Sequence, residues 1–117
     1  MKAARVVNHI LGWLAQYCDT ANLKGFVVGV SGGIDSAVTS TLSAKTGKKT
    51  IVINMPILQE KNQESLSSRH IAWLERNFPT VQGVRVDLSE AFLTLGRTLS
   101  ADIQDELSMA NTRSRLR

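Results

Sequence analysis

Residues 26–37 read Phe26-Val27-Val28-Gly29-Val30-Ser31-Gly32-Gly33-Ile34-Asp35-Ser36-Ala37. The first part is a continuous apolar run rich in β-branched residues, which is typical of a parallel strand buried on both faces. Two glycines follow without a spacer, and apolar residues then recur near one face of a helix up to residue 44. The order of strand, glycine turn and helix predicts an α/β fold with a tight turn where the strand ends.

The glycine turn has the features of an anion-binding site. The first amides of a helix have no intrahelical acceptor, and the helix dipole makes that end partly positive. Gly32 and Gly33 lack a Cβ atom, so they can adopt strained dihedral angles and let a ligand approach the backbone. The hydroxyls of Ser31 and Ser36 can donate hydrogen bonds to phosphate oxygens. The turn is therefore predicted to bind phosphate.

Asp35 is the unexpected member of this turn, because a carboxylate repels a bound polyphosphate unless a cation lies between them. We therefore interpret Asp35 as a ligand for Mg²⁺ that bridges to phosphate. The alternative is that Asp35 only caps the helix. Ser31 or Ser36 would serve as a cap equally well, and capping does not require Ser-Gly-Gly after a buried strand.

The spacing of residues 31–36 differs from the two common phosphate-binding motifs. No Gly-Lys-Ser/Thr follows, as it would in a Walker loop, and the third glycine of a dinucleotide-binding fingerprint is absent. The stretch instead resembles the Ser-Gly-Gly-x-Asp-Ser pyrophosphate loop of the adenylating ATP pyrophosphatases, which cleave ATP to AMP and pyrophosphate. This resemblance implies that Asp35 binds magnesium and that ATP is held by Gly29, Ser31, Gly32, Gly33, Ile34, Asp35 and Ser36.

Length and composition are those of one globular domain, which we assign to residues 1–117 as a single domain of the ATP pyrophosphatase type. Of the 117 residues, 43% are hydrophobic and 21% charged, and no apolar run approaches the length of a membrane span. Polar residues interrupt the N-terminal segment, so no signal peptide is expected. Cys18 is the single cysteine and cannot form an internal disulfide. A reducing, cytoplasmic setting is the default expectation.

The net charge of +4 does not by itself indicate a nucleic-acid-binding protein. Arg113, Arg115 and Arg117 at the C-terminus supply much of the excess, and no aromatic residues alternate with the basic ones. A small anionic ligand is the stronger interpretation. His9 and His70 lie far apart with no Cys or acidic cluster at metal-ligand spacing, so no histidine metal site is expected.

The rest of the chain alternates helical and strand patterns. Helices are predicted at 2–18, at 35 to Gly47, at 62–78, from 89 to about 96 and from about 101; further strands are predicted at 50–55, before Pro56, and at 84–88. This order predicts a three-layer α/β fold with a parallel sheet of three strands and helices on both faces. Such a unit is half of a doubly wound, Rossmann-like sheet and is therefore incomplete.

Two polar residues are placed to complete the nucleotide site. Ligands of open parallel sheets bind at the carboxyl ends of the strands. Asn54 stands near the end of the second strand, and Gln59 lies in the loop that follows it. Both are therefore expected to meet the adenine of ATP.

The C-terminal segment narrows the choice of family and substrate. Asn111-Thr112-Arg113-Ser114-Arg115-Leu116-Arg117 resembles the Asn-x-x-x-Arg-x-Arg segment of ammonia-dependent NAD synthetases, whose loop follows a strand similar to Lys24-Gly25-Phe26-Val27. The resemblance covers nearly all of the chain and implies an adenine nucleotide alpha hydrolase-like fold. It also implies contacts to deamido-NAD from Tyr17, Asn111 and Arg115, although the residues alone favour Tyr17 as a capping aromatic at the edge of the core.

The same resemblance implies a reaction and its participants. ATP and Mg²⁺ would adenylate the nicotinate carboxylate of deamido-NAD, pyrophosphate would leave into the loop, and ammonia would displace AMP to form NAD. A homodimer is also implied, with neither a nucleic acid nor a membrane as partner.

Members of that family are much longer than this chain, so residues 1–117 are expected to be the N-terminal part of such an enzyme, with little activity alone. Two alternatives stay open. The chain could belong to another pyrophosphate-loop enzyme, such as a GMP synthetase or a tRNA-modifying adenylase, in which Tyr17 and Asn111 would be structural. It could also be a noncatalytic ATP-binding module.

Overall fold

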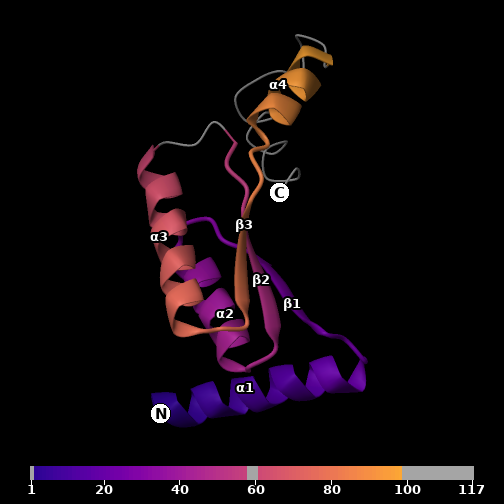
Figure 1. Cartoon of the computed structure of the whole chain (residues 1–117), viewed down its shortest axis with the longest axis vertical. Coiled ribbons are helices and arrows are strands. Elements are labelled where there is room, and N and C mark those ends of the chain that lie inside the picture. Colours follow the sequence, from indigo (N-terminus) through magenta and orange to yellow (C-terminus); the bar gives the residue numbers. More distant parts are fainter. Residues whose placement is uncertain (1, 58–60, 99–117) are drawn as a thin grey trace.

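The computed structural model describes residues 2–57 and 61–98, which form an α/β unit. Its elements in chain order are α1 (Ala3–Thr20), β1 (Gly25–Gly29), α2 (Ile34–Lys45), β2 (Lys49–Asn54), α3 (Lys61–Asn77), β3 (Val81–Arg85) and α4 (Ser89–Thr98). The strands form one parallel sheet in the order β1-β2-β3 (Figure 1). The predicted parallel sheet is therefore confirmed. Gln59 and the expected helix from about residue 101, with Asn111 and Arg115, lie outside the described residues.

One face of the sheet is packed against α2 and α3, and α1 packs in turn against α2 (Figure 1). The buried cluster on this face joins side chains of the sheet to side chains of both helices. Its members are Val30, Ala44, Val52, Ile71, Leu74 and Val81, with Val28 and Phe78 packed against them. This core fixes the first turn of α2 at the end of β1, where the glycine turn lies.

The opposite face of the sheet keeps apolar side chains exposed. Successive residues of a strand point to opposite faces, so Val27 and its partner in register, Ile51, point away from the buried cluster. Val27 is 67% exposed. The α/β class is confirmed, but within residues 2–57 and 61–98 the helices packed most extensively on the sheet, α2 and α3, cover one face. The expected second helical layer is not found in this part of the chain.

The third strand begins earlier than residues 84–88 predicted, since β3 runs from Val81 to Arg85. Gly83, which interrupts the strand pattern in the sequence, is required by close packing against α3. A Cβ atom at Gly83 would lie 2.5 Å from Ile71 Cγ2. The Gly83 amide also donates to Glu75 Oε2 at 3.2 Å, so a side chain of α3 pairs with an amide of this strand.

Two glycines near helix ends behave differently. Gly47 adopts a left-handed conformation with φ of 77° just beyond α2, as the sequence predicted. The helix expected to end near Gly96 instead continues to Thr98, and Gly96 is buried within it. Gly96 therefore does not mark the end of this helix.

Replacing Gly25 with alanine is expected to destabilise the protein by about 3 kcal/mol, an overpacking effect. A Cβ atom there would lie 1.8 Å from the backbone oxygen of Lys49, the partner of Gly25 in the β1–β2 ladder, so the strands would have to separate. Gly12, within α1, is the matched control, because a Cβ there meets nothing within 4 Å. Gly12→Ala should stabilise by roughly 1 kcal/mol through helix propensity. Urea denaturation measures both changes, and a Gly25→Ala midpoint equal to that of the wild type would contradict the close pairing.

Candidate functional site

The predicted glycine turn connects β1 to α2 at the carboxyl end of the sheet (Figure 1). The Val30 amide still donates to Ile53 O at 2.8 Å, so the chain leaves the ladder only after that residue. Gly32 has φ of 92°, a left-handed conformation that favours glycine. Gly33 is the N-cap of α2 and has extended dihedral angles. The local sequence thus places a sharp turn directly before a helix N-terminus.

The hydroxyls of Ser31 and Ser36 hold this turn together. The Ser31 amide donates to Ser36 Oγ at 3.1 Å, and Ser36 Oγ donates to Gly33 O at 3.2 Å. The Gly33 amide donates to Ser31 Oγ at 3.3 Å, and the two hydroxyl oxygens lie 3.3 Å apart. The sequence predicted that these hydroxyls would face a ligand, whereas in this structure they first bond to the turn itself.

The first turn of α2 provides amide donors for an anion. Ala37 N donates to Gly33 O at 3.2 Å, so the amides of Ile34, Asp35 and Ser36 precede the first bond of the helix and have no intrahelical acceptor. The helix dipole adds partial positive charge at the same place. The turn and the helix N-terminus together supply amide donors of the kind that bind a phosphate group.

Asp35 is exposed in that first turn and forms no ion pair within the described residues. The N-cap of α2 is Gly33 rather than Asp35, and the hydroxyl of Ser31, not the Asp35 carboxylate, accepts from the Gly33 amide. No cluster of three His, Cys, Asp or Glu side chains within the same residues could hold a metal by itself. A single free carboxylate fits Mg²⁺, which usually binds one or two carboxylates together with phosphate oxygens and water.

Asn54 and Tyr17 occupy different ends of the sheet. Asn54 ends β2 beside the glycine turn, as predicted, but its side chain is largely buried, with 3% exposed. Tyr17 lies near the end of α1, a helix that crosses the end of the sheet where the strands begin (Figure 1). It is 58% exposed, and its ring lies tilted against that of Trp13, with 5.6 Å between centroids and 32° between planes. Within one chain, the structure therefore does not bring Tyr17 to the turn.

Arg85, at the carboxyl end of β3, forms ion pairs with two neighbouring carboxylates. Its Nε and a terminal nitrogen donate to Glu64 Oε1 at 2.8 and 2.6 Å, and Asp87 Oδ2 lies 3.6 Å from the guanidinium. The bond to Glu64 raises the pKa of Arg85. The Ser89 amide donates to Asp87 Oδ1 at 2.8 Å and lowers the pKa of that carboxyl. This cluster links β3 to α3 and α4 rather than offering a cation for phosphate.

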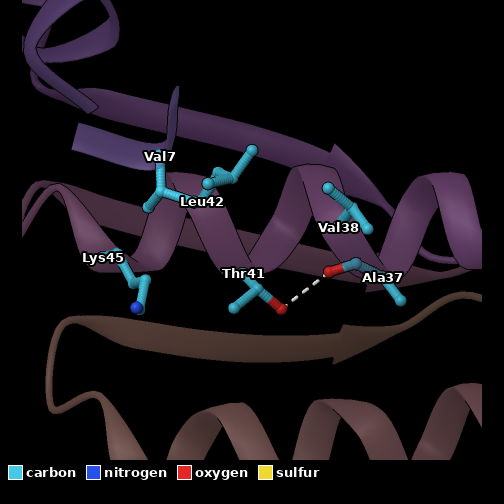
Figure 2. Close-up of a pocket in the computed structure, with 6 residues that line it drawn as sticks. All are labelled: Val7, Ala37, Val38, Thr41, Leu42 and Lys45. Carbon is cyan, nitrogen blue, oxygen red and sulfur yellow. Dashed lines mark hydrogen bonds between the residues drawn. The ribbon is translucent and has the colours of Figure 1, made fainter. Parts of the chain in front are cut away.

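A separate groove of about 280 Å³ lies between α1 and α2 and is shown in Figure 2. Its lining is mostly apolar and consists of Val7, Ala37, Val38, Thr41, Leu42 and Lys45. The Thr41 hydroxyl donates to Ala37 O at 2.7 Å, so it is already paired. Apart from the Lys45 ammonium, the groove offers no charged group to an anion. None of its lining residues belongs to the turn at residues 31–36.

Comparison with known proteins identifies the family of this chain. The family model for NAD synthase matches residues 6–117. The NH(3)-dependent NAD(+) synthetase of Mycoplasmopsis pulmonis is 34% identical over 110 residues, which are 93% of this chain and 40% of that protein. A structure of NMN synthetase from Francisella tularensis has a TM-score of 0.80 at 26% identity and covers 99% of this chain and 47% of its own.

The NH3-dependent NAD synthetase of Campylobacter jejuni, at 19% identity and a TM-score of 0.85, has the same fold and is covered over 48% of its length. The chain thus spans less than half of each of these proteins. By the match to its family model, the chain belongs to the NAD synthase family.

Proposed function

We propose that residues 1–117 form one domain that supplies the ATP-binding part of an enzyme making NAD from deamido-NAD and ammonia. The observation that carries this proposal is the turn at residues 31–36, which presents the free amides of α2 and an exposed carboxylate in a chain of the NAD synthase family. The named relative from Mycoplasmopsis pulmonis is described as an NH(3)-dependent NAD(+) synthetase.

The proposed reaction has two steps. The nicotinate carboxylate of deamido-NAD attacks the α-phosphorus of ATP, and the bond to pyrophosphate breaks. Ammonia then displaces AMP from the mixed anhydride to give the amide. The amides of Ile34, Asp35 and Ser36, with the dipole of α2, would hold the negative charge that develops on the leaving pyrophosphate. No protein nucleophile is required.

Asp35 would hold the Mg²⁺ that this chemistry requires. Its carboxylate is exposed and has no cationic partner within the described residues, as a metal ligand beside a phosphate site should be. Mg²⁺ bound there would neutralise charge on the pyrophosphate. Asn54 and Gln59 for adenine, and Tyr17, Asn111 and Arg115 for deamido-NAD, remain part of the proposal as the sequence predicted them.

The substrate can be tested directly. The chain is fused to the part of the Mycoplasmopsis pulmonis relative that it does not match, and the chimera is incubated with ATP, magnesium, ammonium and one acceptor at a time. Deamido-NAD is the expected acceptor, with AMP and pyrophosphate formed in equal amounts to NAD. Deamidated NMN is the second acceptor to test, because one structural neighbour is an NMN synthetase. Turnover of xanthosine monophosphate or a tRNA instead would favour the other pyrophosphate-loop enzymes, and ATP binding without pyrophosphate release would favour a binding module.

Self-association is expected, with a homodimer as the proposed assembly. Exposed apolar side chains lie on the uncovered face of the sheet, at Val27, and on α1, where Trp13 is 58% exposed. Sedimentation velocity should show a dimer at micromolar concentration. Val27→Glu and Trp13→Glu, measured separately, locate the surface used, and a clean monomer of the wild type would contradict the proposal.

Location and other partners remain predictions from the sequence. No helix in residues 2–57 and 61–98 is long and apolar enough to span a bilayer. A cytoplasmic protein without nucleic-acid partners is what we propose from the single cysteine and the charge distribution.

A further inference from the structure

A buried hydroxyl joins the phosphate-binding turn to α3. Ser40, in α2, has no exposed surface, and three polar atoms surround its Oγ atom. Ser36 O lies at 2.7 Å, Ala37 O at 3.1 Å and His70 Nε2 at 2.9 Å. The first two are carbonyl oxygens of the same helix, whereas His70 comes from α3, thirty positions along the chain.

One arrangement of protons satisfies all three contacts. A carbonyl oxygen can only accept, and the hydroxyl has one hydrogen, so in this arrangement Ser40 donates to Ser36 O, the nearer carbonyl. The lone pairs of Ser40 Oγ then accept from His70 Nε2–H, whereas a Ser40 hydroxyl that donated to His70 would leave both carbonyl contacts without a hydrogen. We adopt this arrangement, in which neutral His70 is the Nε2–H tautomer. Burial also lowers the pKa of His70, which favours the neutral ring.

The His70 ring is itself held in place. It stacks on Trp73 with 5.9 Å between centroids and 20° between planes, and Trp73 in turn meets Phe78 edge to face at 6.0 Å. Phe78 packs against the buried cluster beneath the sheet. The His70 ring is thus connected to the core through the rings of Trp73 and Phe78.

Ser36 is bonded to Ser40 through its backbone carbonyl and to the turn through its side-chain hydroxyl. Its carbonyl accepts from Ser40, while its hydroxyl accepts from the Ser31 amide at 3.1 Å and donates to Gly33 O at 3.2 Å. We propose that His70 is a positioning residue which, through Ser40, holds Ser36 and thereby sets the shape of the turn that binds pyrophosphate. The ligand named in this inference, pyrophosphate, rests on the proposed function, whereas the effect of His70 on the shape of the turn does not.

α2 contains a matched control for this link. Ser43 is 3% exposed and its hydroxyl donates to Thr39 O at 2.9 Å, the same bond within the helix that Ser40 makes. Among the contacts that the structure describes for Ser43 Oγ, none comes from α3. Ser43→Ala therefore removes an equivalent helix bond without touching the link to His70.

The experiment compares His70→Leu, His70→Gln, Ser40→Ala and Ser43→Ala in the 117-residue chain. Amide hydrogen exchange of residues 31–36 is measured without ligand, and binding of inorganic pyrophosphate with magnesium is measured by calorimetry. His70→Leu and Ser40→Ala should each accelerate exchange in the turn and weaken pyrophosphate binding about fivefold, the usual effect of one hydrogen bond. A double variant that combines His70→Leu with Ser40→Ala should bind pyrophosphate no more weakly than either single variant, because both substitutions break the same link. His70→Gln keeps a side-chain N–H donor and should restore both readouts to within about twofold.

The control variant shows what a purely structural role would look like. Ser43→Ala should lower the midpoint of urea denaturation but leave hydrogen exchange in the turn and pyrophosphate binding unchanged. If His70→Leu and Ser40→Ala behave like Ser43→Ala in both readouts, the positioning role is wrong. If wild-type protein binds no pyrophosphate, the proposed function fails, and the exchange rates alone still decide whether His70 shapes the turn. If His70→Leu does not fold, the comparison of Ser40→Ala with Ser43→Ala gives the same decision.

Discussion

Asp35→Asn should bind magnesium-ATP roughly 100-fold more weakly than the wild type, or about 2.7 kcal/mol, while its affinity for adenosine stays the same. The carboxylate is exposed at the first turn of α2 and has no ion-pair partner in the described part of the chain. Its loss should therefore affect a ligand that carries a bridging cation and spare one that carries none. Calorimetry with ATP, with and without magnesium, and with adenosine measures the difference.

Asp19→Asn is the control for the loss of a negative charge. Asp19 pairs with Lys48, near the end of the sheet where the strands begin, and its side chain is 64% exposed. An exposed ion pair contributes little to stability, so this variant should bind magnesium-ATP like the wild type. Chelation of magnesium should weaken ATP binding by the wild type and leave Asp35→Asn almost unaffected. Equal losses for ATP and adenosine would instead mean that Asp35 supports the fold.

The strand, turn and helix around Ser31 could be predicted because their signals are local. A β-branched run, adjacent glycines and a helical apolar pattern lie within one short segment, and each constrains its own backbone. The third strand was predicted at the wrong position because the contact that explains its glycine joins residues far apart in the sequence. Glycine is required at position 83 of this strand because Ile71, on α3, leaves no room for a side chain, and the sequence does not show which helix residue packs there.

The site shows the same division between local and tertiary information. Ser31, Gly32 and Ser36 were placed correctly at the turn, but their bonds to one another depend on the exact dihedral angles of the glycines. The link from Ser40 to His70 was missed, since it joins two helices. A serine four positions after Ser36 on the same helix was the available signal, and by itself it also fits an ordinary bond to the preceding turn.

The 117-residue chain alone should form NAD at least about 1,000-fold more slowly than the chimera that restores the unmatched part of the Mycoplasmopsis pulmonis relative. Adenylation requires the attacking carboxylate and the α-phosphorus to be aligned, and precise alignment supplies several kcal/mol of the barrier reduction. The described residues provide the proposed binding turn for one end of ATP and one candidate metal ligand. Tyr17, the candidate contact to deamido-NAD among them, lies at the other end of the sheet (Figure 1).

The test incubates each protein with ATP, magnesium, deamido-NAD and ammonium and follows NAD, AMP and pyrophosphate by chromatography. Pyrophosphate binding should be retained by the short chain, because the turn and the first turn of α2 are complete within residues 29–37. Pyrophosphate binding without NAD formation would therefore show that residues 29–37 suffice for binding, whereas alignment of the two reacting groups needs residues outside this segment. NAD formation by the 117-residue chain at the rate of the chimera would contradict this prediction and would show that residues 1–117 contain the whole site.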